Sequence, residues 1–271
     1  MFRLQRPLYL CSMEARRISG LLSGLMMPLL LIFSTSSTLQ AQTKTINTQY
    51  QSWFSVNSTL KVSPRWAIIA DFHTRRNHFM ADNNFYFART GVQYTLDKNL
   101  TVAAGYGHFW AYPTTKNWHT IAHENRIYQQ IQYSSKWRAA TILQRLRNEQ
   151  RWQQKMVNDA YSGQLRFTDR VRYLLSMTIP VFKNKKMPSL ALADELCLQA
   201  GKEIVYNTFD QNRFFIGIKE QLRPDLSFDM GYMRVYQQKK SGYEFDRNHT
   251  FRLFFYYSPQ LYKHPASPVR K

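Results

Sequence analysis

The chain has 271 residues, a net charge of +20, a mean hydropathy of -0.48 and an aromatic content of 15%. Beyond the first 41 residues no segment stays apolar for the roughly 18 residues that a membrane helix needs, which excludes a helical membrane protein. The positive charge is typical of chains that bind nucleic acid or an anionic surface, and the length allows one large domain or two small ones.

The N-terminal segment has the three parts of a secretory signal in order. Arg16 and Arg17 precede an apolar run over residues 18–33, and a small, polar stretch follows to Ala41. This arrangement predicts a signal peptide over residues 1–41, cleaved before Gln42, with translation starting at Met1 or Met13. The segment carries few of the charges, so the mature chain stays strongly basic.

Cysteine usage points to the same compartment. Cys11 would leave with the signal peptide, and Cys197 alone would remain in the mature chain. An intramolecular disulfide is then impossible. An exported protein of this size without disulfides indicates a bacterial envelope more than a small secreted scaffold.

Strand-like segments with alternating polar and apolar residues recur along the mature chain, and no convincing amphipathic helix separates them. The segments are Gln49–Val62, Trp66–Arg76, Asn84–Leu96, Leu100–Trp110, His123–Ser134, Trp137–Trp152, Thr168–Phe182, Ser189–Gly201, Asn212–Leu222, Leu226–Gln238 and Asn248–Ser258. The sequence therefore predicts an all-β protein.

The expected connections alternate in length, with short turns such as 97–99 and 223–225 and long ones such as 111–122, 153–167 and 239–247. This asymmetry is typical of an up-and-down antiparallel transmembrane β-barrel with short periplasmic turns and longer extracellular loops. If both ends of the chain are periplasmic, the strand number must be even. We therefore expect about twelve strands, with ten as the alternative, although eleven segments are visible.

Charged residues stand at every second position of several segments, above all in the stretch Arg145 to Arg151. Since strand side chains alternate between two faces, these charges share one face, and in a barrel in lipid that face lines the lumen. The predicted lumenal charge ladder comprises Asp71, Arg89, Glu124, Arg126, Arg145, Arg147, Glu149, Arg151, Arg170, Arg172, Glu195, Arg213, Lys219 and Arg252. Such a ladder either fills and stiffens a narrow barrel or favours anions in a pore.

Tryptophans gather at the expected strand ends, as in the aromatic girdles of outer-membrane barrels. Trp66 and Trp137 follow short turns, and Trp110, Trp118 and Trp152 lie toward the long loops. We expect these five to be interface aromatics, with Trp53 as the exception.

Several short motifs resemble one family over nearly the whole mature chain. They are R-L-R-N-E-Q-R at 145–151, R-V-R-Y at 170–173 followed by Pro180, Asp194-Glu195, F-D-Q-N-R at 209–213, and Gly231-Tyr232. In their order and spacing they are similar to the domain of unknown function 2490 family of Gram-negative outer-membrane β-barrel proteins. The resemblance implies an outer-membrane barrel and brings no substrate. The tail beyond Tyr257 departs from barrels that stop at a terminal aromatic.

Enzyme chemistry has weak support. His119, His123 and Glu124 do not suit one metal ion, because strand residues four apart are about 13 Å apart. No motif ties any histidine, including His73, His108 and His249, to a nucleophile.

The expectation is a cleaved signal peptide (1–41), an outer-membrane barrel (42–258) and a basic, proline-containing tail (259–271). Its function would be structural or that of a narrow anion-favouring pore, without cofactor or metal. The alternative is an outer-membrane enzyme that modifies lipids or acyl chains. We expect a monomer in contact with outer-membrane lipid and small anionic solutes, and no nucleic-acid partner.

Overall fold

The computed structural model describes residues 43–184 and 187–262, so the predicted signal peptide and most of the tail lie outside the described residues. The fold is all-β, as predicted. Its strands are β1 (Thr45–Lys61), β2 (Trp66–Asn77), β3 (Asp82–Asp97), β4 (Leu100–Ala111), β5 (Ala122–Trp137), β6 (Ala140–Val157), β7 (Ala160–Ile179), β8 (Ser189–Ala200), β9 (Phe209–Arg223), β10 (Leu226–Gln238) and β11 (Glu244–Tyr257). Within the described ranges, no helix has the length and apolar character to cross a membrane.

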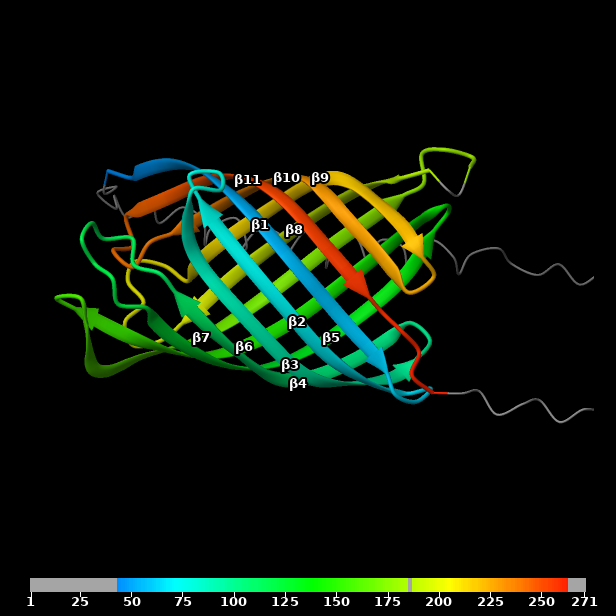
Figure 1. The fold of residues 1–271 in the computed structure, drawn as a ribbon, viewed down its shortest axis with the longest axis horizontal. Coiled ribbons are helices and arrows are strands. Elements are labelled where there is room, and N and C mark those ends of the chain that lie inside the picture. Colours follow the sequence, from blue (N-terminus) through cyan, green and yellow to red (C-terminus); the bar gives the residue numbers. More distant parts are fainter. Residues whose placement is uncertain (1–42, 185–186, 263–271) are drawn as a thin grey trace, which may run out of the picture. The chain divides into compact units, whose positions relative to one another are not determined.

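The strands form one closed barrel in which each strand lies beside its neighbours in sequence (Figure 1). All consecutive pairs are antiparallel. The ring closes where β1 and β11 pair in parallel, from Thr45 opposite Glu244 to Ser58 opposite Tyr257. An odd strand number is compatible with closure because the first and last strands run in the same direction. The expected twelve strands, and the alternative ten, are corrected to the eleven of the described residues.

Because β1 and β11 run in the same direction, both begin at one end of the barrel and finish at the other (Figure 1). We call these the Thr45 end and the Tyr257 end. The turns 62–65, 98–99, 138–139 and 224–225 lie at the Tyr257 end, together with the longer connection 180–188. The long connections 112–121 and 201–208 lie at the Thr45 end.

Two of the expected long loops are wrong. Residues 153–167 are mostly strand, since β6 and β7 extend to 18 and 20 residues and meet in the turn Asn158-Asp159. Both turn residues have positive φ, 49° and 58°, as a two-residue hairpin turn requires, and Asn and Asp tolerate that conformation better than other non-glycine residues. The expected loop 239–247 is likewise shortened, because β11 already begins at Glu244.

The two faces of the barrel wall differ in chemistry. Along β6, Arg147, Glu149 and Arg151 are buried inside, whereas Leu146, just before Arg147, is 48% exposed on the outside. The same inversion recurs around the ring. Exposed outer residues include Ile68, Phe72, Val92, Ile127, Ile131, Val171, Tyr173, Leu175, Phe214, Ile216 and Ile218.

The interior also holds apolar packing. Trp53, Phe215, Met233 and Val235 form a buried cluster with Ala191 between β1 and the strands β8 to β10. The interior is therefore filled by aromatic and apolar side chains beside β1 and by charged side chains beside β5 to β9.

Candidate functional site

Glu149 on β6 is the centre of a buried network of arginines and carboxylates. Its carboxylate accepts hydrogen bonds from Arg170 Nε (3.0 Å) and Nη2, from Arg172 Nη1 (2.6 Å) and from Arg126 Nη1 (3.4 Å). Arg147 Nη1 lies 3.6 Å away. Glu149 is 3% exposed, so four guanidinium groups share one carboxylate that water hardly reaches.

A second carboxylate, Glu195 on β8, extends the network around the ring. Arg172 Nη2 lies 2.8 Å from each of its oxygens, and Arg145 Nη2 and Arg213 Nη1 approach to 2.8 and 2.9 Å. Arg172 thus bridges Glu149 and Glu195 with separate nitrogens of one guanidinium, which a lysine with its single nitrogen cannot reproduce. The two carboxylates join side chains of five neighbouring strands, β5 to β9.

Toward the Thr45 end, Glu124 on β5 forms the third centre. It pairs with Arg126 on its own strand, with Arg151 Nε at 2.8 Å and with the Gln153 amide at 2.5 Å. Arg126 also reaches Glu149, so the three centres form one continuous cluster. We call it the lumen network: Glu124, Arg126, Arg145, Arg147, Glu149, Arg151, Arg170, Arg172, Glu195, Asp210 and Arg213.

Asp210 was missed in the sequence. It lies 3.0 Å from Arg170 Nη1 and is 4% exposed. Strand alternation places it on the face opposite Arg213, yet the pairing of β8 with β9 shifts between Cys197 and Leu198, and Asp210 is the extra residue of that bulge. A bulge turns a side chain to the other face, and sequence alternation alone gives no signal for it.

The remaining ladder residues form two smaller groups. Asp71 and Arg89 pair across β2 and β3. On β10 and β11, Asp229 accepts hydrogen bonds from Arg252 Nη2 (2.7 Å) and the Tyr256 hydroxyl (2.6 Å). Lys219 lies with its Nζ 5.2 Å from the Tyr256 ring centre. The residues of the predicted ladder therefore form the lumen network and two smaller groups, and not one cluster.

Aromatic rings complete the interior. Tyr128 lies between Arg89 and Arg147, whose guanidinium carbons are 5.1 and 5.2 Å from its ring centre. It covers Gly91 and Gly105, opposite each other on β3 and β4, where an added Cβ would collide with backbone atoms and with Tyr128. Arginine faces stack well on aromatic rings, so these contacts hold cations that have few carboxylate partners.

Arg75 is a further residue that the sequence did not indicate. Its guanidinium carbon lies 3.2 Å from the Trp53 ring centre and 4.3 Å from that of Phe85. Arg75 thus covers one side of Trp53, which faces inward from the middle of β1 and is 3% exposed.

The five other tryptophans lie at two levels. Trp66 begins β2 and Trp137 ends β5, both at the Tyr257 end and about half exposed. Trp110 is near the end of β4, and Trp152 lies in the half of β6 nearer the Thr45 end. The Trp152 ring contacts Phe167, with ring centres 5.4 Å apart. Trp118 lies in the connection between β4 and β5 at the same Thr45 end.

The histidines fall into separate groups. His73 faces the interior beside Phe87 and Phe254. On the outer wall, His108 Nε2 and His123 Nδ1 are 3.0 Å apart, and His249 Nδ1 lies 2.7 Å from the Tyr232 hydroxyl. Over residues 43–184 and 187–262 no three His, Cys, Asp or Glu side chains are grouped as a metal site would require.

Polar contacts tie the loops of the Thr45 end to each other. Asp159, in the β6–β7 turn, accepts hydrogen bonds from the backbone N–H groups of Thr120 (2.8 Å) and His119 (2.9 Å), and these lower the pKa of its carboxyl. Lys155 Nζ lies 2.7 Å from Glu203 and lowers the pKa of that carboxyl through a hydrogen bond. The extended β6–β7 hairpin therefore contacts the loops on both of its sides.

The family model described as Protein of unknown function (DUF2490) matches residues 50–247. The chain belongs to this family. In this DUF2490 member the matched region runs from β1 into β11 and so contains every residue of the lumen network. A comparison with curated proteins found no match.

Proposed function

We propose that this protein is a non-enzymatic outer-membrane β-barrel of a Gram-negative bacterium, whose lumen is closed by the lumen network and whose role is structural. The observation that carries the proposal is the inversion of the wall. Glu149 and Arg170 are 3% and 2% exposed inside, while apolar side chains such as Ile216 are 42% exposed outside.

Lipid is the solvent that suits such an outer face. Soluble monomers rarely expose contiguous apolar patches above a few hundred Å², and here the exposed apolar residues recur on strand after strand. Strands of 12 to 20 residues exceed the roughly 9 to 11 that a tilted membrane strand needs. The tryptophans of both barrel ends fit interface girdles, with the Tyr257 end facing the periplasm.

A narrow anion-favouring pore is the open form of the same proposal. Arginines outnumber carboxylates in the lumen network, which favours anions in any water-filled path. The burial of the network favours closure, however, because an ion could pass only by separating paired side chains.

Planar-bilayer recordings of the refolded protein test this choice. A closed lumen predicts no steady conductance, whereas an anion-selective current would replace the structural role by the pore. The barrel itself is tested by migration on unboiled gels, where a folded membrane barrel runs faster than the boiled chain. Unchanged migration together with solubility after export would contradict the whole proposal.

The enzyme alternative has one observation in its favour. On the outer wall at the Thr45 end, the Tyr106 hydroxyl, His108 and Asn125 are hydrogen-bonded to each other, and His108 contacts His123. A lipid-modifying enzyme would need such a group at lipid level. Unchanged lipid composition in a strain that lacks the protein would count against this role.

A further inference from the structure

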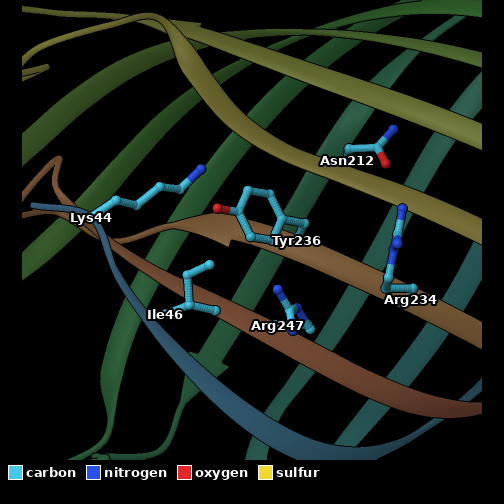
Figure 2. A pocket seen from close by; sticks show the side chains of 6 residues that line it. All are labelled: Lys44, Ile46, Asn212, Arg234, Tyr236 and Arg247. Atoms are coloured by element: carbon cyan, nitrogen blue, oxygen red, sulfur yellow. The ribbon is translucent and has the colours of Figure 1, made fainter. Parts of the chain in front are cut away.

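A pocket on the outer wall near the Thr45 end is lined by three cations. Arg234 on β10 and Arg247 on β11 lie on neighbouring strands, with Lys44 just before β1 and Asn212 on β9 (Figure 2). Both arginines point outward, since Val235 and Asn248 beside them are buried inside at 0% and 3% exposure. The cavity measures about 340 Å³.

No carboxylate lines this pocket within the described ranges, and the Asp194 carboxylate beside it accepts a hydrogen bond of 2.7 Å from the Asn212 amide and not from a cation. Neither Arg234, Arg247 nor Lys44 forms an ion pair with a carboxylate within the described ranges. Elsewhere in the barrel, inward arginines share carboxylates. Two strands and the residue before β1 thus place three exposed cations around one cavity, and none of the three is paired with a carboxylate of the described chain.

Tyr236 lines the pocket and packs against Phe245 beside it. The rings of Tyr236 and Phe245 are stacked with centres 5.1 Å apart, and Lys44 Nζ lies 4.8 and 4.2 Å from these centres. These contacts hold the Lys44 ammonium group beside the cavity. Figure 2 shows the Lys44 side chain extended toward Tyr236.

We propose that the pocket binds the phosphate-bearing headgroup of a lipid, with Arg234, Arg247 and Lys44 as its cationic partners. A phosphate carries up to two negative charges and several acceptor oxygens, and the arginine fork matches it with paired hydrogen bonds. A single carboxylate would neutralise one of the three cations. This inference rests on the proposed membrane location, since it places the site at the boundary between loops and lipid.

A lipid suits the pocket better than a free phosphate because of what surrounds it. Ile46 lines the cavity and is 41% exposed, and farther along the outer face of β9 Phe214 and Ile216 are exposed to 41% and 42%. The headgroup would pair with the cations while acyl chains lie along these apolar residues.

The test compares binding of three probes to the full-length refolded barrel in an uncharged detergent, by native mass spectrometry. The probes are phosphatidic acid, diacylglycerol with the same acyl chains, and inorganic phosphate. The double variant Arg234→Gln/Arg247→Gln should weaken phosphatidic acid binding about tenfold, because two of three charge-assisted contacts are lost. Binding of diacylglycerol should not change.

The matched control is Lys136→Gln/Arg138→Gln, which removes the same charge from the exposed β5–β6 turn region at the other end. It should leave phosphatidic acid binding within about twofold, because charges at the other end of the barrel are too far away to contact a headgroup in the pocket. Equal weakening by both double variants would overturn the inference. Inorganic phosphate that binds as tightly as phosphatidic acid would overturn its lipid part.

Failure of this inference can be separated from failure of the proposed function. Both double variants should still fractionate with the outer membrane and run faster before boiling. A wild-type protein that does so but binds all three probes alike contradicts the lipid site alone. A soluble wild-type protein contradicts the membrane location, and the lipid site with it.

Discussion

At the scale of single residues, the interior depends on carboxylates that serve several arginines at once. Glu149 contacts Arg126, Arg147, Arg170 and Arg172. A buried ion pair adds little net stability compared with an apolar pair, but removal of one partner leaves buried charges without compensation. The loss of a shared carboxylate therefore costs more than the loss of any one arginine.

Glu149→Ala should lower the free energy of unfolding by about 3 to 5 kcal/mol, because four guanidinium groups lose their common partner. Glu149→Gln, which preserves the volume, should cost nearly as much. Samples are heated to a series of temperatures before they are loaded on a gel that is run cold. The measurement is the temperature of heating at which the fast-migrating folded form disappears. Lys239→Ala is the control, since its half-exposed pair with Asp246 (3.5 Å) is worth at most about 1 kcal/mol. Equal shifts for Glu149→Ala and Lys239→Ala would contradict a network centred on Glu149.

The sequence predicts which residues face inward wherever strands alternate regularly. The period of two placed Glu124, Arg147 and Glu195 inside because each lies in an uninterrupted stretch of strand. Asp210 was not predicted to face inward, because one extra residue in β9 reverses the alternation there. Which arginine meets which carboxylate depends on the register between strands, and alternation within one strand does not determine that register.

At the scale of elements, the β6–β7 hairpin is the feature least visible in the sequence. Lys155, Asn158, Asp159 and Gly163 within residues 153–167 are typical of a loop. In the structure Lys155 and Gly163 belong to strands and only Asn158 and Asp159 form a turn, because β6 and β7 pair with each other up to Val157 and Ala160. Asp159 then reaches residues 119 and 120. Such pairing is tertiary, so local composition underestimates it.

Asp159→Asn should release the connection 112–121 without disturbing the turn. Asn tolerates the positive φ of this position as well as Asp does, but a neutral amide oxygen accepts hydrogen bonds less strongly than a carboxylate. Limited proteolysis of the folded barrel should cut this connection several times faster in the variant. Asn158→Asp is the matched control, because it keeps Asp159 and alters the same turn. Equal cleavage of wild type and Asp159→Asn would show that the contact does not restrain the loop.

The same contact should respond to acid. Because the hydrogen bonds lower the pKa of Asp159 below its ordinary value of 3.8, the carboxylate form is favoured in the fold. The restraint is therefore fully present above that ordinary value and is lost as the pH falls through the lowered pKa. Hydrogen exchange at the N–H groups of His119 and Thr120, corrected for its intrinsic pH dependence, should lose protection only in that acidic range. Loss of protection already near pH 6 would contradict this assignment.

At the scale of the whole molecule, the parallel pairing of β1 with β11 explains both the odd strand number and the opposite ends at which β1 begins and β11 finishes. The eleven segments were visible in the sequence. The expectation of twelve strands came from the assumption that the first strand begins and the last strand finishes on the same side of the membrane. Closure is a property of the ring as a whole, and no local pattern in β1 or β11 shows that the two strands run in the same direction.

A disulfide across the seam tests this closure. Val56 and Phe255 are opposite each other on the outer face, so Val56→Cys/Phe255→Cys in a Cys197→Ser background should cross-link under mild oxidation. Adjacent strands are about 4.8 Å apart, within the distance of about 7 Å between Cα atoms that a disulfide allows. One intervening strand would double that separation and prevent the bond.

The control Val56→Cys/His249→Cys lies on the same two strands but out of register, and should stay reduced. The cross-linked protein should keep its fast migration on unheated gels, because the bond joins residues that are already neighbours. Failure of the matched pair to cross-link in a folded barrel would contradict closure by β1 and β11 and would restore an additional strand between them.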